Sequence, residues 1–240
     1  TFPKGESHVL LNLGEGLTNE SGAMVKKVSD TEWEGVKLQG TFCYNSQAVF
    51  PIYFVMRISR QPLASGYWKK QRTMKGAEAE WDPDNGKYKL YTSYQKELSG
   101  DDIGVWMNFN TEANEQIDVQ MGVSFVSIAN ARENLEKEQS GKDFDIIHAE
   151  AKRKWNDDLS RILVEGGTKT ERTIFYTALY HTLIHPNILQ DVNGQYPAME
   201  SNDIKTMSEG NRYTVFSLWD TYRNVHQLLT LVYPERQRDM

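Results

Sequence analysis

The stretch Val49-Phe-Pro-Ile-Tyr-Phe-Val-Met-Arg-Ile-Ser59 decides how the first half of the chain folds. Every even-numbered residue in it is apolar, whereas the odd positions include Tyr53, Arg57 and Ser59. Because a β-strand places successive side chains on opposite faces, this alternation is typical of a strand. The stretch therefore predicts a strand with one buried face and one mixed face.

The same alternation recurs on both sides of this stretch. Longer candidates are Ile103–Asn110 and Gln116–Ile128, and shorter ones are Val9–Leu13, Val36–Tyr44 and Tyr88–Tyr94. Segments rich in Asp, Asn, Gly and Pro separate them, as expected of turns. Many alternating strands with no helical pattern between them favour an antiparallel sheet architecture. We therefore predict a β-sandwich domain over residues 1–130.

The hydrophobic period changes near residue 130. Ala129–Gln139 is charged and rich in helix-forming residues, and apolar side chains then recur every three or four positions from Phe144 to Ile162. The pair Gly166-Gly167 is a typical helix stop. We interpret residues 131–166 as linker helices.

A further helical region follows over residues 167–240. Thr168-Lys-Thr-Glu171 is a capping box that predicts a helix start, and His185-Pro186 predicts its end. Residues 187–212 read as irregular, with Asn193-Gly194 as a hairpin turn, and a third helix is expected from about Ser217 to Leu231. Pro234 is typical of the first turn of a fourth helix, and the chain stops at Met240 within two turns of it. We interpret this as a truncation.

Composition excludes several classes of protein. The 240 residues carry a net charge of −6, spread evenly along the chain, which argues against nucleic acid or an anionic membrane as the partner. The single cysteine, Cys43, excludes a disulfide framework. No run approaches the roughly 18 apolar residues of a membrane span, and residues 1–5 carry no signal-peptide pattern. Because the chain starts without Met, the missing signal says nothing about the compartment.

Three short motifs have simple structural interpretations. Asp82–Gly86 resembles a calcium loop, but Gly falls at the fifth position rather than the sixth, so a turn is favoured. His181 and His185 could face one metal ion, but Thr182 replaces the Glu of the zinc-protease motif, which favours core or supporting histidines. Asn19-Glu-Ser21 matches a glycosylation sequon, and such matches are frequent by chance.

The most informative stretch is Ser217-Leu-Trp-Asp-Thr-Tyr-Arg-Asn-Val-His226. Asp220 lies near a predicted helix start and can pair with Arg223 three positions later. A carboxylate accepts hydrogen bonds from two neighbouring hydroxyl groups, and the indole of Trp219 can cover the apolar side of a sugar ring. An N-terminal carboxylate beside a core tryptophan explains the same residues equally well.

The sequence resembles glycoside hydrolase family 92. The helical half carries the resemblance in three stretches, Phe175–Asn187, Tyr213–Arg223 and Leu229–Arg236. The first half and the linker agree with it at Val28–Glu32, Tyr53–Arg57, Val123–Arg132, Asp143–Asp145 and Ile162–Gly167. The resemblance covers nearly the whole chain, and these motifs together are specific.

The resemblance implies a calcium-dependent, exo-acting α-mannosidase that inverts the anomeric centre. The implied fold is an N-terminal β-sandwich, then linker helices, then an (α/α)6 barrel of which residues 167–240 supply only the first helices. It implies export to the periplasm or surface of a bacterium. Asp220 corresponds to a ligand of the terminal mannose hydroxyl groups, and Trp219 and Arg223 to residues that shape and orient that site.

The departure from the family is length. Its members are several hundred residues longer, and their acid and base residues lie in the part of the barrel that would follow Met240, so we assign no catalytic residue and no metal ligand here. We expect the 240 residues to be inactive alone and to pair with the rest of the barrel or with each other. Two alternatives remain, a non-catalytic carbohydrate-binding or scaffold module, and a barrel glycosidase for another sugar.

Overall fold

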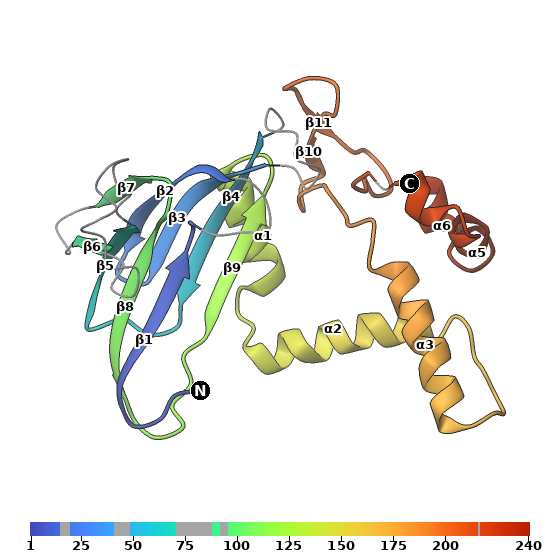
Figure 1. The fold of residues 1–240 in the computed structure, drawn as a ribbon, viewed down its shortest axis with the longest axis horizontal. Helices are drawn as coiled ribbons and strands as arrows, with labels where there is room; N and C mark the ends of the chain where they lie inside the picture. Colours follow the sequence, from blue (N-terminus) through green and yellow to red (C-terminus); the bar gives the residue numbers. More distant parts are fainter. Residues whose placement is uncertain (15–19, 41–48, 71–87, 92–95, 216) are drawn as a thin grey trace, which may run out of the picture. The chain divides into compact units, whose positions relative to one another are not determined.

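The computed structural model describes all residues except 15–19, 41–48, 71–87, 92–95 and 216. The chain divides into two compact units, the sandwich unit Thr1–Glu138 and the helical unit Gln139–Met240 (Figure 1). Within the described ranges, no helix has both the length and the hydropathy needed to cross a bilayer. The motif Asp82–Gly86, together with Asn19 and Cys43, lies outside the described residues.

The sandwich unit consists of two antiparallel sheets. The strands are β1 (Gly5–Asn12), β2 (Glu20–Ser29), β3 (Glu32–Gly40), β4 (Val49–Ile58), β5 (Ala64–Lys70), β6 (Tyr88–Tyr91), β7 (Glu97–Gly100), β8 (Ile103–Thr111) and β9 (Val119–Ser124). One sheet has the order β1-β8-β5-β6 and the other β7-β2-β3-β4-β9 (Figure 1). The predicted antiparallel β-sandwich is confirmed.

The core lies between the two sheets and follows the alternation seen in the sequence. Phe54, Met56 and Ile58 of β4 point into it, and every second residue of β8 from Ile103 to Phe109 meets them. The phenol of Tyr67 in this core is paired, as most buried polar groups are. The Tyr67 hydroxyl donates to the carbonyl of Lys96 at 2.7 Å and accepts from the amide of Lys27 at 2.8 Å.

The second face of β4 is also covered, and here the sequence prediction of a mixed face is incomplete. Helix α1 (Ile128–Gln139) packs on the outer face of the five-stranded sheet, where Val55, Ala131 and Leu135 are fully buried. Gly122 of β9 permits this approach, because a Cβ atom there would lie 2.2 Å from the carbonyl oxygen of Ala131. The strand and the helix are therefore in close backbone contact at Gly122, and a larger side chain there would force α1 away from the sheet.

A network of ion pairs holds α1 to the same face. Glu32 of β3 accepts hydrogen bonds from Arg57 of β4 and Arg132 of α1, and Arg57 also pairs with Glu136 of α1. Burial by itself raises the pKa of the Glu32 carboxyl, but the hydrogen bonds from Arg57 and Arg132 outweigh it and place that pKa below 4.5. Glu32 can remain charged at a buried position because both arginines pair with it.

Several strand predictions need correction. The strand expected over Gln116–Ile128 ends at Ser124, because the hydroxyl of Ser127 accepts the amide hydrogen of Asn130 and starts α1. Strands β2, β5 and β7 were not predicted, because charged residues and glycines interrupt their alternation. The ends predicted for Val36–Tyr44 and Tyr88–Tyr94 run into undescribed residues.

The helical unit contains α2 (Phe144–Leu159), α3 (Lys169–Leu183), α4 (Leu218–Thr221), α5 (Val225–Val232) and α6 (Pro234–Asp239), with a small hairpin of β10 (Gln195–Pro197) and β11 (Ile204–Thr206) between α3 and α4. The predicted capping box is present, since Thr168 and Glu171 exchange both hydrogen bonds. The predicted turn at Asn193-Gly194 is present, since the amide of Asp191 donates to the carbonyl of Gln195 at 2.8 Å. It precedes β10 and does not join β10 to β11.

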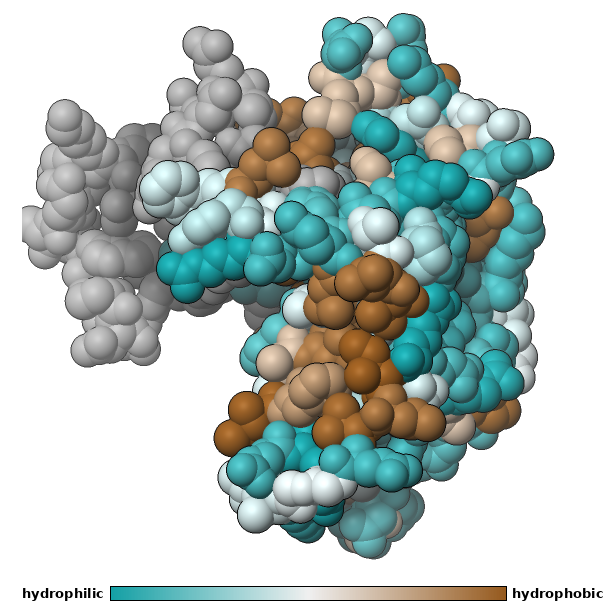
Figure 2. Space-filling view, turned by 90° about the vertical axis from the view of Figure 1, so that its right-hand side faces the viewer, coloured by the Kyte–Doolittle hydropathy of each residue, from teal (hydrophilic) through white to brown (hydrophobic). Residues whose placement is uncertain are grey.

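The core of the helical unit is small. Leu179 and Leu183 of α3 pack against Leu229 and Tyr233, with partly buried neighbours that include Tyr176. No residue of α2 is fully buried, and α2 ends at Leu159, earlier than expected. Phe144 and Trp155 of its predicted apolar face are exposed, whereas Leu159 packs against the core of this unit. Figure 2 shows a hydrophobic patch on the side of the molecule that carries α3 and α5. This unit leaves much of its apolar surface in contact with solvent.

Candidate functional site

The predicted site residues lie on and after α4, which is a single helical turn. The helix expected over Ser217–Leu231 is broken into α4 and α5, because Asn224 adopts the left-handed conformation at φ 62°. Asparagine tolerates this region better than other non-glycine residues, so its position explains the break. The turn of α4 begins where the amides of Asp220 and Thr221 both donate to the carbonyl of Ser217.

Helices α5 and α6 hold this turn in place through His226. The imidazole of His226 contacts the hydroxyl of Thr221 through Nε2 at 3.1 Å and the side chain of Gln237 on α6 through Nδ1 at 3.1 Å. The sequence analysis gave His226 no role.

The support is anchored in the core of the helical unit. Tyr233 is buried, and its hydroxyl donates to the carbonyl of Asp158 at 2.8 Å. Burial, reinforced by the negative charge of Asp158, raises the pKa of Tyr233. Arg236 donates to the carbonyl of Leu183 at 2.9 Å, where α3 ends. The turn that carries the site thus rests on α3, α5 and α6 together.

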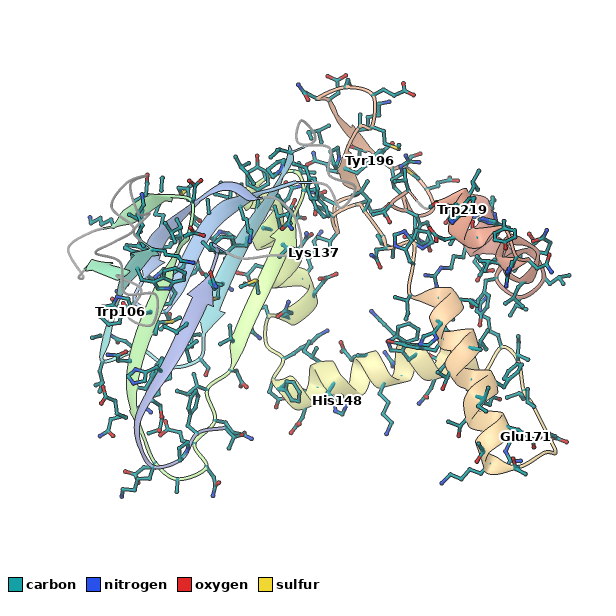
Figure 3. All side chains as sticks on the ribbon, in the orientation of Figure 1. Trp106, Lys137, His148, Glu171, Tyr196 and Trp219 are labelled. Atoms are coloured by element: carbon teal, nitrogen blue, oxygen red, sulfur yellow. The ribbon has the colours of Figure 1, made fainter. Side chains whose placement is uncertain are left out.

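Trp219 and Asp220 are both presented to solvent. The Trp219 side chain (Figure 3) is 85% exposed. Asp220 is also exposed. The interpretation of Trp219 as a core tryptophan is therefore wrong for this structure. An open indole next to an open carboxylate offers an apolar plane and an acceptor of two hydroxyl groups, which is what a sugar ring requires.

Arg223 does not form the predicted pair with Asp220. Its Nε donates to the hydroxyl of Tyr222 at 2.8 Å, and its guanidinium lies 5.3 Å from the centre of that ring. The reason is the break after Thr221, because residues three apart meet only on a continuous helix. The Asp220 carboxylate makes no hydrogen bond or ion pair with the residues that the structure describes.

The two histidines that could have formed a metal site take separate positions, and both are exposed rather than buried in a core. His185 contacts the carbonyl of Val215 at 3.0 Å, which ties the end of α3 to the segment before α4. His181 lies beside Tyr180, with the ring centres 5.7 Å apart. In the described ranges, no three His, Cys, Asp or Glu side chains gather as a metal site would need.

A groove of about 540 Å3 lies on the helical unit, away from the predicted residues. It is lined by one face of α3, including Arg172, Tyr176 and Tyr180, together with Leu159 at the end of α2. Arg172 is already used within this region, since it donates to the carbonyls of Gly166 and Gly167 at 2.7 and 2.8 Å. The groove therefore adds no residue to the site at Asp220.

Solved structures with the same fold include family GH92 α-mannosidases. The family GH92 α-mannosidase of Bacteroides thetaiotaomicron is 26% identical, with a TM-score of 0.82 over 100% of this chain and 30% of its own. The same enzyme in complex with mannoimidazole gives a TM-score of 0.81 at 26% identity, over 99% of this chain and 29% of that one. A family GH92 inverting mannosidase of Bacteroides thetaiotaomicron VPI-5482 shares the fold at 23% identity, with a TM-score of 0.77 over 96% of this chain and 28% of its own.

A relative found by sequence is also described as a glycosidase. An uncharacterized secreted glycosidase of Arthroderma benhamiae is 27% identical over 127 residues, which is 50% of this chain and 15% of that protein. The chain thus spans less than a third of the proteins it matches. The model of the glycosyl hydrolase family 92 N-terminal domain matches residues 1–124 and that of the family 92 catalytic domain matches residues 130–240, so the chain belongs to glycosyl hydrolase family 92.

Proposed function

We propose that the protein to which this chain contributes removes terminal α-linked mannose from glycans by inverting hydrolysis with the help of calcium. The observation that carries the proposal is the match to a family GH92 α-mannosidase over 100% of this chain, with a TM-score of 0.82. Residues 1–130 would supply the sandwich domain, residues 131–166 the linker helices, and residues 167–240 the first helices of an (α/α)6 barrel.

In this proposal Asp220 binds the hydroxyl groups of the terminal mannose. Its exposed carboxylate, on a helical turn held by Thr221 and His226, can accept two hydrogen bonds from neighbouring hydroxyls. The exposed indole of Trp219 would cover the apolar side of the same ring. Arg223, oriented by the Tyr222 hydroxyl, would shape the edge of the site.

Calcium and the catalytic pair are not assigned to these residues. The described part of the chain has no cluster of three His, Cys, Asp or Glu, so the residues do not fit a complete metal site. Inverting hydrolysis needs two carboxyl groups about 6.5–9.5 Å apart, one that protonates the leaving oxygen and one that activates a water molecule on the opposite face of the sugar ring. We place both carboxyl groups in the part of the enzyme that follows Met240, and we expect the 240 residues alone to release no mannose.

We also propose export, to the periplasm or cell surface of a bacterium. The support is that the relative in Arthroderma benhamiae is described as a secreted glycosidase. Mannose-containing glycans outside the cytoplasm would be the substrates, and the sequence offers no basic surface for nucleic acid, with a net charge of −6.

The test compares the 240 residues with the uncut gene product. Mannose release from α-linked mannobioses is measured for both, with and without a calcium chelator, and NMR identifies the anomer that appears first. The expected result is chelator-sensitive release of β-mannose from the longer product and none from the 240 residues. Release by the 240 residues would contradict the assignment of the catalytic pair, and α-mannose as first product would contradict inversion.

Asp220→Ala in the active product tests the site itself. Losing a carboxylate that binds two hydroxyl groups should lower kcat/KM by about 100-fold or more, since hydrogen bonds to charged groups are worth about 1.5–3 kcal/mol each. Asp157→Ala, which removes another exposed carboxylate of the helical unit, is the matched control and should leave kcat/KM unchanged. Equal activities of the two variants would contradict the role of Asp220.

A further inference from the structure

The outer face of the four-stranded sheet carries an aromatic surface that the proposed mannosidase site does not use. Residues of β8 alternate, so that Val105 and Met107 are buried in the core while Trp106 and Asn108 point outward. Figure 3 shows Trp106 on the side of its sheet that faces away from the second sheet. Trp68 of the neighbouring strand β5 occupies the same outer face.

Each of these tryptophans lies opposite a glycine. The register pairs Trp106 with Gly66 and Trp68 with Gly104 across β8 and β5. A Cβ atom on Gly104 would lie 2.5 Å from Cε2 and Cζ2 of Trp68, so the indole of Trp68 lies across the Gly104 backbone. The two rings are diagonal neighbours, with a spacing of about 7–8 Å typical of such pairs.

The exposed part of Trp106 is apolar. Its Nε1 is buried, and no described residue accepts a hydrogen bond from it, while the side chain as a whole remains partly exposed. The exposed ring surface is therefore carbon. Leu10 of β1, which the register places opposite Trp106, is 67% exposed and extends the apolar surface to the next strand.

A row of polar groups lies beside this surface. Asn108 and His8 form the next pair along β8 and β1, and the His8 Nδ1 lies 2.8 Å from the Asn108 Oδ1. With its oxygen engaged, the Asn108 amide group keeps its N–H donors directed to other acceptors. The amide and the imidazole are two positions from the indole of Trp106 on one face, within reach of a single small ring.

We propose that this surface, formed by Leu10, Trp68, Trp106, Asn108 and His8, binds a neutral carbohydrate. A sugar ring has an apolar face that packs on an indole and hydroxyl groups around its edge that bond to amides and imidazoles. An anionic ligand is disfavoured because the Glu6 carboxylate lies 4.0 Å from the His8 Nε2, and no positively charged side chain such as Lys or Arg lies in the register rows of Trp106 or Asn108. The choice of mannose as the sugar rests on the proposed function.

Affinity electrophoresis of the 240-residue chain in gels containing soluble α-mannan tests this surface. We expect the wild-type chain to be retarded, Trp106→Ala to bind about tenfold more weakly, and Trp106→Phe to recover part of the retardation because it restores an aromatic plane. Far-UV circular dichroism checks that each variant is folded. Trp155→Ala, a change at a partly exposed tryptophan of α2, is the matched control and should migrate like the wild type.

Two further variants separate this proposal from the mannosidase site. If Asn108→Ala also weakens retardation while Asp220→Ala leaves it unchanged, the sheet surface is the binding site. A wild-type chain that is not retarded, or a Trp106→Ala chain retarded as strongly as wild type, overturns the inference. Retardation lost only in Asp220→Ala overturns it as well, and in that case it supports the proposed mannose site. In the longer product, Trp106→Ala should leave mannobiose hydrolysis unchanged.

Discussion

In the sandwich unit Trp33, Tyr67 and Phe109 are each 1% exposed, whereas in the helical unit Phe144 is 69% and Leu218 70% exposed. The sandwich closes two sheets over each other and then covers one outer face with α1. The helical unit buries only a short seam between α3, α5 and the start of α6. The difference indicates that the sandwich is a self-sufficient folding unit, while the helices need further contacts to reach comparable stability.

The largest expected effect separates the two cores. Phe109→Ala should lower the free energy of unfolding of the sandwich by about 3–5 kcal/mol, because it leaves a cavity at a fully buried site. Leu229→Ala should lower that of the helical unit by about 2–5 kcal/mol and leave the sandwich transition unchanged. Urea unfolding followed by circular dichroism and by tryptophan fluorescence would resolve the two transitions.

The matched control for Phe109 is Leu63→Ala, which removes an apolar side chain of the sandwich that is 73% exposed. It should change stability by less than about 0.5 kcal/mol. A single transition that both core variants shift equally would show that the two units unfold together. The prediction that the sandwich and the helical unit differ in stability would then be wrong.

A smaller effect tests the attachment of α1 to the sandwich. Because hydrogen bonds from Arg57 and Arg132 hold the pKa of Glu32 below its usual 4.5, the unfolded chain binds this proton more readily than the folded one. The contribution of Glu32 is therefore present above pH 4.5 and is lost as the pH falls through the lower folded-state pKa. Glu32→Gln should cost about 1–3 kcal/mol at neutral pH and less in acid.

Glu112→Gln provides the comparison for this pH dependence. Glu112 pairs with Lys4 on the surface, where the carboxylate side chain is 78% exposed, so its loss should be within about 0.5 kcal/mol at every pH. The measurement is the free energy of unfolding of the sandwich between pH 2.5 and 7 for the wild type and both variants. Parallel curves for wild type and Glu32→Gln would mean that the buried ion pairs do not stabilise α1.

Much of the fold was accessible from sequence because the inner faces of several strands alternate regularly. The alternation placed the core residues of β8 and three of β4 correctly, namely Phe54, Met56 and Ile58. It failed at Phe50, which is 37% exposed. Thr168 and Glu171 marked the start of α3. Strand β5 was missed because Gly66 and a run of polar residues hide its period, and its place depends on pairing with β8. Such pairing is a long-range property that local patterns do not contain.

The candidate site was only partly accessible. Trp219 and Asp220 stand out as an aromatic residue beside a carboxylate at a helix start, and the structure exposes both. The break at Asn224 was not foreseen, because asparagine adopts a left-handed conformation only where the surrounding contacts require it. That break removes the expected partnership of Asp220 with Arg223 and gives His226 a supporting role.

The smallest expected effect examines whether local signals matter more in the helical unit than in the sandwich. Thr168→Ala removes the hydroxyl that accepts the amide hydrogen of Glu171, and should cost about 1 kcal/mol in the helical transition, with Thr170→Ala as a control without a cap. The substitution also removes the hydroxyl that donates to the Glu171 carboxylate, but it leaves the hydrogen bond from the Thr168 amide, which is the main cause of the lowered pKa of Glu171. Because α3 buries only Leu179 and Leu183, a local loss at its first turn has little tertiary packing to offset it. If Thr168→Ala and Thr170→Ala prove equally stable, packing rather than capping sets the start of α3.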